Sequence, residues 1–337
     1  MAGIINMFKR PKLSIGLDLG SSYIKTVKVE HNLHPLIRDF ILLKISPQQD
    51  LSSILKEVLQ KINIENFPLN ISLSGQNVLC RYVEFPLMKG EEFKSALKFE
   101  IGKYIPFSLD QIHFDGTILK EDAKNNKMLV LLTSAKKEYI SERLNLIYNL
   151  GYTVNLIDVD CLALANCFNF NIALENKSYA VLNIGASYSN LDILESGIPV
   201  LSRDIRIAGN EITQRIATDL NCDWENAEKI KILASHDESS FQKIKPSLES
   251  VLSLLAQEIR ISFDYYESQS IFTVEKLYLC GGQTLLTNIA EILTHYLGVK
   301  AEIYNPLEGF EFSKDLDSQT LRQVALQFAV VMGLGLR

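Results

Sequence analysis

The chain has 337 residues, of which 47% are hydrophobic, and its formal net charge is −6. This length and composition predict a folded globular protein of two domains, with room for insertions and with large cores. The charges are spread along the chain without a basic block, which excludes nucleic acid as the main partner. We find no signal peptide and no apolar run long enough to span a bilayer.

The five cysteines form no Cys-x-x-Cys pair and have no His nearby. This pattern indicates buried thiols of a cytosolic protein rather than disulfides or zinc ligands. Residues 1–10 are apolar and then basic, which suits contact with an anionic membrane surface, but the segment is short. A strap packed on the domain, or a disordered tail, is the preferred interpretation of these residues.

The first motif, within residues 14–25, is an alternating strand that breaks at Gly20 and resumes as a second strand. Gly20 lets the backbone approach an anion closely, and the residues after it bring backbone N–H groups and hydroxyls to the same point. Asp18 precedes the turn, where a carboxylate can order a hydrated Mg²⁺. An ordinary hairpin turn is the alternative for this short pattern. The residues assigned to phosphate here are Gly20, Ser21, Ser22 and Tyr23.

The next segments alternate in character. We expect a third strand over 36–45, an amphipathic helix beginning at Leu51 and a short buried strand over 70–74. The pattern of expected strands and helices then changes over residues 78–151, which we interpret as a self-contained α+β unit inserted into the first domain. Its expected elements are strands over 79–85, 113–119 and 128–133 and helices over 91–104 and 137–150.

The main fold resumes with a strand over 153–159 that leads into a helix, with Asp158 and Asp160 at the junction. The opening motif then recurs, because residues 182–188 align without a gap on residues 17–23 and the match continues to Glu195. Two copies predict two hairpins that face each other.

Three helices are expected next, one opening at 208–211 and two over 224–232 and 248–266. A buried strand over 276–280 then runs into Gly281-Gly282, and the chain continues with helices over 285–297 and 319–334. Taken alone, the order of strand, Gly281-Gly282 and helix indicates a tight strand-to-helix turn. Beside two phosphate hairpins, the same order favours a slot for adenine and ribose.

Together these segments resemble the actin-like ATPase superfamily, in which a nucleotide lies between two duplicated β-sheet domains. Within it the chain is most similar, over nearly its whole length, to the PilM family of type IV pilus assembly. The segments that carry the likeness are 16–22 with Lys25, 99–107, 157–160, 208–213, Gly281-Gly282 and 331–337. The cell-division protein FtsA has a similar inserted domain but continues into a membrane-binding amphipathic tail, whereas this sequence stops at Arg337.

The resemblance implies an α/β protein with the actin-like ATPase fold, in which two duplicated mixed β-sheet domains surround a nucleotide cleft and one carries an inserted α+β subdomain. We expect residues 1–77 and 152–177 to form the first domain, with 78–151 as the inserted subdomain. Residues 178–318 would form the second domain, and 319–337 a C-terminal helix that returns to the first.

The resemblance also implies ATP and Mg²⁺ as cofactors. Besides the first turn, the phosphate ligands would be Lys25, Gly185, Ala186 and Ser187. Asp18 would order Mg²⁺, and Asn183 would join the metal site by hydrogen-bonding a water, at a position where family members usually carry an acid that helps hold the metal. Asn183 has no charge, so we expect slow hydrolysis or none. Asp160 would position an attacking water, with a helix N-cap as the alternative.

The remaining implied contacts surround the base and sugar. The ribose and adenine would meet Gly209, Asn210, Glu211, Gly281 and Gly282, with Glu228 and Lys231 as neighbours. A solvated helix face is the alternative for those last two residues.

For partners, the resemblance implies that the cytoplasmic tail of a PilN-like inner-membrane protein docks in a groove beside the inserted subdomain. The chain would then be cytoplasmic and peripheral at the inner face of the membrane, with attachment through the partner and with self-association possible. Three other functions compete: an FtsA-like membrane tether, a sugar-kinase-like phosphotransferase and an adaptor that binds nucleotide without turnover.

Overall fold

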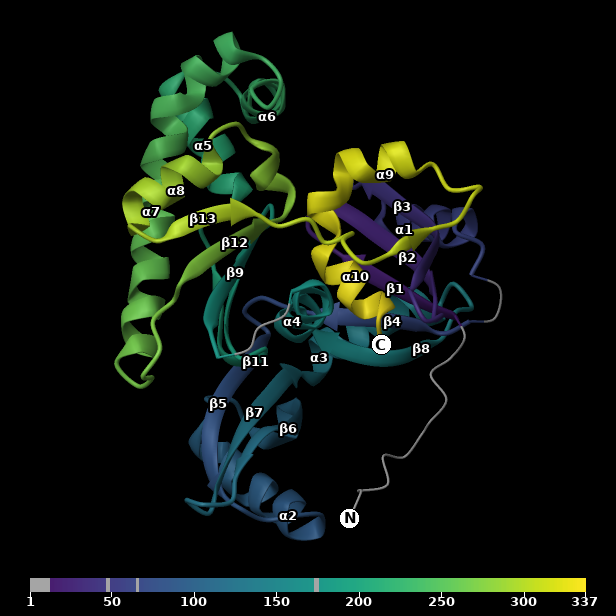
Figure 1. Ribbon diagram of the computed structural model, residues 1–337. Coiled ribbons are helices and arrows are strands. Elements are labelled where there is room, and N and C mark those ends of the chain that lie inside the picture. Colours follow the sequence, from purple (N-terminus) through teal and green to yellow (C-terminus); the bar gives the residue numbers. More distant parts are fainter. Residues whose placement is uncertain (1–12, 47–48, 65–66, 173–175) are drawn as a thin grey trace.

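The structure is a computed structural model that describes residues 13–46, 49–64, 67–172 and 176–337. Two large β-sheets lie on either side of a pair of helices, and a smaller third sheet projects away from them (Figure 1). Residues 1–10, for which we considered membrane contact, lie outside the described residues. Among the described residues no helix has the length and apolar character needed to cross a bilayer.

The first sheet has the strand order β14-β3-β2-β1-β4-β8. Strands β1, β2 and β3 form an antiparallel meander, whereas β4 and β8 run parallel to β1. The bounds are β1 Leu13–Leu19, β2 Tyr23–Glu30, β3 Leu36–Lys44, β4 Leu69–Leu73, β8 Val154–Val159 and β14 Glu311–Phe312. Helix α1 (Leu51–Lys61) covers this sheet and begins where the Asp50 side chain accepts the Ser53 N–H.

The second sheet repeats this arrangement, with the order β11-β10-β9-β12-β13. Three antiparallel strands are again followed by two parallel ones. The bounds are β9 Ser178–Ile184, β10 Ser189–Glu195, β11 Ile198–Ile205, β12 Lys276–Cys280 and β13 Lys300–Ile303. Its helices are α5 Gly209–Asp219, α6 Trp224–Leu233, α7 Glu238–Glu267 and α8 Ile289–Leu297. The repeated topology accords with the repeated sequence motif.

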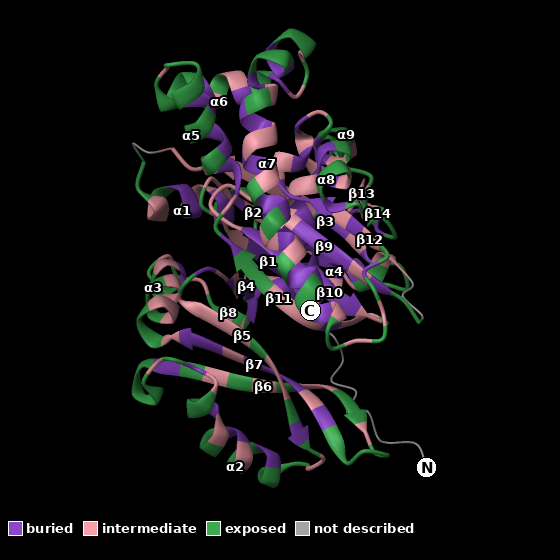
Figure 2. Cartoon of the chain, turned by 90° about the vertical axis from the view of Figure 1, so that its left-hand side faces the viewer, coloured by how far each residue is buried: buried purple, intermediate pink, exposed green. Residues whose placement is uncertain are grey.

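The third sheet, β5-β7-β6, has a core of its own. Its elements are β5 Val78–Pro86, α2 Glu91–Glu100, β6 Ile112–Asp122 and β7 Lys127–Lys136. Helix α3 (Lys137–Tyr148) follows, and its Ile147 packs into the core of the first sheet instead. Buried residues follow the strands of the large sheets, whereas β6 alternates with exposed positions (Figure 2).

Helices α4 (Asp160–Asn171) and α10 (Ala329–Gly335) lie between the two large sheets (Figure 1). They share one hydrophobic core with strands of both sheets. Glycine lets the two helices approach, because a Cβ on Gly333 would overlap the Ala163 carbonyl oxygen. Glycine also lets α10 approach the first sheet, because a Cβ on Gly16 of β1 would lie 2.5 Å from the Val331 oxygen. The Asn166 side chain donates to the Gly333 oxygen at 2.8 Å. The crossing is therefore close and hydrogen-bonded.

Several expected elements differ from those observed. We expected no strand between residue 194 and the helix that opens at 208–211, but β11 lies there and forms the edge of the second sheet. Helix α7 begins at Glu238, ten residues before the expected start, and it continues through Pro246. The expected helix over 285–297 is a 3₁₀ turn over Gly282–Leu285 followed by α8. The expected final helix is divided into α9 (Ser318–Val324), a 3₁₀ turn (Ala325–Phe328) and α10.

Candidate functional site

The turns of the two hairpins meet between the large sheets. The Ser187 hydroxyl donates to the Ser21 hydroxyl at 2.9 Å. The two turns also share one constraint. A Cβ on Gly20 would lie 2.8 Å from the Tyr23 carbonyl oxygen, and a Cβ on Gly185 would lie 2.8 Å from the Tyr188 carbonyl oxygen. Glycine at both positions lets each turn fold tightly. Backbone and hydroxyl groups from both sheets therefore converge at one point.

The N-terminus of α5 adjoins the second turn. The Gly209 N–H donates to the Gly185 oxygen at 3.0 Å, and the Asn210 N–H donates to the Ala186 oxygen at 2.8 Å. The Asn210 side chain also donates to the Ser187 hydroxyl at 3.1 Å. The neighbouring Glu211 accepts the Ala208 N–H. Residues 209–211, which the resemblance assigns to the ribose and adenine, are thus fixed beside the second turn.

The Gly281-Gly282 turn closes the same region from the end of β12. Gly281 has φ +99°, and its Cβ would lie 2.6 Å from the Ile184 nitrogen, so only glycine fits there. Gln283, one residue further, extends its side chain against Gly209. The structure therefore gathers the expected ribose and adenine residues around the end of β9.

Lys231, which is buried, and Glu228, which is half-buried, form an ion pair beside the start of α5. The Lys231 Nζ lies 2.8 Å from a Glu228 carboxylate oxygen and donates to the Gly209 oxygen at 3.1 Å. Burial lowers the pKa of Lys231, and the Glu228 charge opposes that shift. Burial works against ionisation of Glu228, but Lys231 offsets it and the pKa of Glu228 is lowered. The alternative of a solvated helix face is therefore wrong for Lys231.

Asp18 and Asp160 form an acidic pair at the base of the first turn. The Lys25 Nζ lies 2.6 Å from a carboxylate oxygen of Asp18. Asp160 accepts the Ser72 hydroxyl at 2.6 Å. Burial, and then the charge of Asp18, raise the pKa of Asp160 to about 6. Asp160 is the first residue of α4, whose N-cap is Val159, so the N-cap alternative is wrong.

The other acid at this junction has a structural partner, because the Asp158 carboxylate is held by the Arg337 guanidinium at 2.6 Å. The donor set near the first turn fits a hydrated divalent cation. Mg²⁺ keeps several waters and needs only one or two carboxylates, and a cation beside Asp18 would relieve its repulsion with Asp160. The described residues contain no cluster of three His, Cys, Asp or Glu side chains able to chelate an ion directly.

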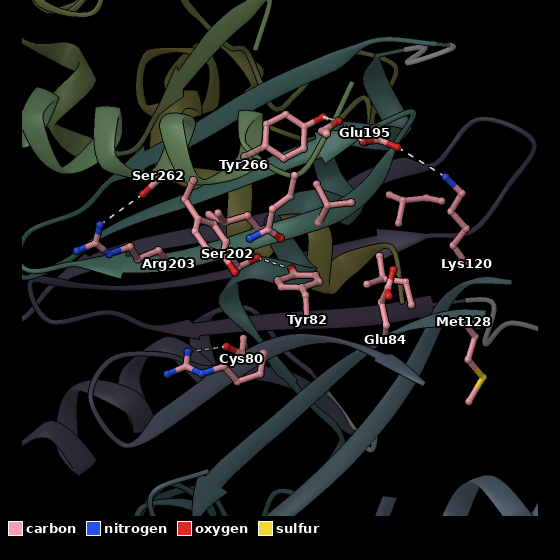
Figure 3. A pocket seen from close by; sticks show the side chains of 18 of the residues that line it. Cys80, Tyr82, Glu84, Lys120, Met128, Glu195, Ser202, Arg203, Ser262 and Tyr266 are labelled. Atoms are coloured by element: carbon pink, nitrogen blue, oxygen red, sulfur yellow. Dashed lines mark hydrogen bonds and ion pairs between the residues drawn. The ribbon is translucent and has the colours of Figure 1, made fainter. Parts of the chain in front are cut away.

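Two hollows lie beside the third sheet. The larger, of about 740 Å³, is bounded by β5, β11 and α7, and its lining includes Tyr82, Lys120, Arg203 and Tyr266 (Figure 3). The smaller, of about 340 Å³, lies between the end of β4, the start of α4 and β11, and contains Asp160. Both hollows share the wall made by Cys80, Arg81, Ser202 and Arg203.

Some residues at the site were not expected from the sequence. Ser72, Asn190 and Asp204 each hold a candidate residue or its neighbour through a hydrogen bond. Asp192, fully buried on β10, was missed as well, although one signal was available. The internal alignment places it opposite Val27, and a carboxyl in place of a buried valine is an anomaly.

Similar folds occur in two bacterial proteins. One is the ethanolamine utilization protein EutJ from Carboxydothermus hydrogenoformans, with TM-score 0.59 and 15% identity over 97% of this chain and 90% of that one. The other is MreB5 of Spiroplasma citri bound to ADP, with TM-score 0.51 and 14% identity over 96% and 94%. The chain thus has the actin-like ATPase fold.

A more similar structure is described as the PilM-PilN type IV pilus biogenesis complex, with TM-score 0.85 and 26% identity over 97% of this chain and 99% of that one. Residues 16–337 also match the family model described as type IV pilus assembly protein PilM. The chain belongs to this family.

Proposed function

We propose that this chain is a cytoplasmic ATP-binding component of a type IV pilus assembly platform and that it binds the cytoplasmic tail of a PilN-like inner-membrane protein. Membership of the PilM family supports the pilus role. The observation that carries the nucleotide proposal is the direct contact of the two hairpin turns, which brings phosphate-binding groups from both sheets together. Through the partner's tail, the chain is peripheral at the inner face of the membrane.

In this proposal ATP lies between the large sheets. Its phosphates contact the two turns, and its ribose and adenine lie against residues 209–211 and the Gly281-Gly282 turn. Lys25 offers a cation close to the first turn, and Asp18 holds Mg²⁺ through its waters. Bound Mg²⁺ supplies charge neutralisation for the phosphates.

Turnover is slow in this proposal. Asp160 has a pKa of about 6, so near neutral pH it is available to accept a proton from a water. Asn183 contributes no charge, and its amide is already engaged with Asn190 at 3.0 Å. The metal therefore has one acid fewer to hold it than is usual in the family.

A charge placed between the two turns tests the nucleotide site. Ser187→Glu should weaken ATP binding by about 10-fold or more, because a carboxylate beside phosphates is repelled in a site partly shielded from water. Ser187→Gln has nearly the same size without the charge and should weaken binding much less. Calorimetry with ATP and Mg²⁺ measures both. Equal affinities for the two variants would argue against phosphate at the second turn.

The partner's tail docks beside the third sheet in this proposal. β5 and β11 are edge strands of their sheets, and both border the larger hollow. An edge strand presents unpaired N–H and C=O groups to an extended peptide, and pockets between side chains add specificity. Tyr82, Leu201 and Tyr265 offer such apolar contacts in this hollow.

Recruitment to lipid tests the tail. The purified protein should stay in the supernatant with bare anionic liposomes and sediment with liposomes that display the tail of its PilN-like partner. A short amphipathic start binds lipid only marginally, since membrane affinity scales with buried apolar area and charge attraction. Deletion of residues 1–10 is the control. Strong sedimentation with bare liposomes that this deletion abolishes would favour direct, FtsA-like attachment.

A further inference from the structure

A chain of polar side chains runs from the second hairpin to the segment that leads into the third sheet. The Asn183 amide donates to the Asn190 side-chain oxygen at 3.0 Å, and the Asn190 amide donates to one Asp204 carboxylate oxygen at 2.7 Å. The other Asp204 oxygen accepts the Gly75 N–H at 2.7 Å. Three adjacent strands of the second sheet thus connect one end of the candidate phosphate site to Gly75.

The direction of every bond in this chain is fixed by chemistry. An ionised Asp204 only accepts, so Asn190 must turn its amide nitrogen toward it. The Asn190 oxygen then faces Asn183, which must donate. An aspartate at position 183 cannot donate, and one Asn190 amide cannot satisfy carboxylates on both sides. The chain therefore explains why an uncharged donor stands at position 183.

Gly75 joins the first sheet to the third, since it lies between β4 and β5. It is buried with φ +82°, and the ring of Tyr188, at the end of the second turn, lies against it. Two more contacts tie this segment to β11 and the residue after it. Arg206 donates to the Gln76 side chain at 2.6 Å, and the Tyr82 and Ser202 hydroxyls are 2.6 Å apart. The orientation of β5 thus depends on the second sheet.

We propose that the chain Asn183–Asn190–Asp204–Gly75 couples the second hairpin to the segment before β5, so that nucleotide bound between the large sheets alters the affinity of the groove beside β5 for the partner's tail. This inference rests on the proposed function for its two ligands. The groove wall made by Ser202 and Arg203 lies on β11, the same strand as Asp204. A shift of β9 at the turn is therefore transmitted across β10 and β11 to a wall of the groove.

Hydrogen exchange at the Gly75 amide tests the chain in nucleotide-free protein. Asn183→Asp should speed this exchange by about 10-fold or more, the factor that loss of a hydrogen bond to a charged group allows. Asp204→Asn alone should have a smaller effect, because both asparagine side chains can turn over and keep every partner. The double variant Asn183→Asp with Asp204→Asn should restore protection, since the chain then runs complete in the opposite direction.

The double variant makes this test specific, because a merely destabilising substitution at position 183 would not be rescued at position 204. Arg206→Ala is the matched control, since it removes the neighbouring contact to Gln76 and leaves the chain intact; it should change Gly75 exchange much less. Unchanged exchange in Asn183→Asp, or failure of the double variant to restore protection, would overturn the inference.

Binding measurements test the coupling itself. In the unaltered protein, ATP with Mg²⁺ should change the dissociation constant of a tail peptide by about 5-fold or more, the lower range of allosteric couplings. Asp204→Ala should lose this dependence, so that ATP no longer changes the dissociation constant of the tail peptide for this variant. Tail affinity that ATP leaves unchanged in the unaltered protein would overturn the coupling. Absence of ATP binding would instead refute the proposed function, and the exchange experiment would still decide whether the chain exists.

Discussion

At the scale of single residues, Asp192 lies where an aspartate is costly. It is fully buried on β10, and neither carboxyl oxygen has a hydrogen-bond partner among the described residues. Burial raises its pKa well above the ordinary value. The Ser202 hydroxyl, opposite it on β11 and hydrogen-bonded to Tyr82, partly opposes that shift, and the charges of Asp204 and Asp160 add to it. The carboxyl therefore keeps its proton to a higher pH than an exposed aspartate does. Its counterpart in the first hairpin is the buried Val27.

We predict that Asp192→Val raises the free energy of unfolding by about 1–3 kcal/mol at neutral pH, the cost of burying an unpaired polar group. The gain should grow as pH rises. The unfolded carboxyl loses its proton above a pKa of about 3.9, whereas the folded carboxyl keeps it until its raised pKa is reached, so the natural protein loses stability through this window. Urea denaturation at pH 5 and pH 8 measures both effects. A variant of lower stability would show that the carboxyl is satisfied in solution.

At the scale of elements, the crossing of α4 and α10 depends on Gly333. We predict that Gly333→Ala lowers the free energy of unfolding by about 3 kcal/mol or more, because the added methyl group overlaps the Ala163 backbone. Gly102→Ala is the matched control: a Cβ there meets no atom within 4 Å, so the change should be near neutral. Thermal unfolding of both variants gives the comparison. Equal melting temperatures would mean that α10 moves aside without cost.

Two of the elements that differ from expectation, β11 and α7, share a physical reason. Pro199 lies in β11 and Pro246 in α7, and a proline within a run normally argues against a strand or a continuing helix. β11 accommodates its proline because it is an edge strand. The hairpins were predictable because their motif occurs twice. Ser72 and the Gly75 contact of Asp204 were not, because Ser72 pairs with Asp160, 88 residues away, and Asp204 with Gly75, 129 residues away, and no local pattern specifies such pairing.

At the scale of the whole molecule, the third sheet has the smallest core of the three sheets among the described residues. Among the described residues its core has nine buried hydrophobic side chains, against thirty in the largest core of the second sheet. We predict that amides of β7 exchange with solvent faster than those of β9, because a small core opens with a lower free energy. Hydrogen exchange with mass spectrometry resolves the two strands. Equal protection would indicate that the molecule unfolds as one cooperative unit.

The contact between α4 and α10 also determines how the large sheets can move. α4 packs mainly on the second sheet and α10 on the first, and at Gly333 the backbone of one helix lies directly against the other. No layer of side chains separates them there, so the direct backbone contact opposes sliding of one helix along the other. A change of angle between the two large sheets is then expected to be a rotation with this crossing as its pivot. Displacement increases with distance from Gly333, so a small rotation at the crossing moves the outer parts of the molecule most.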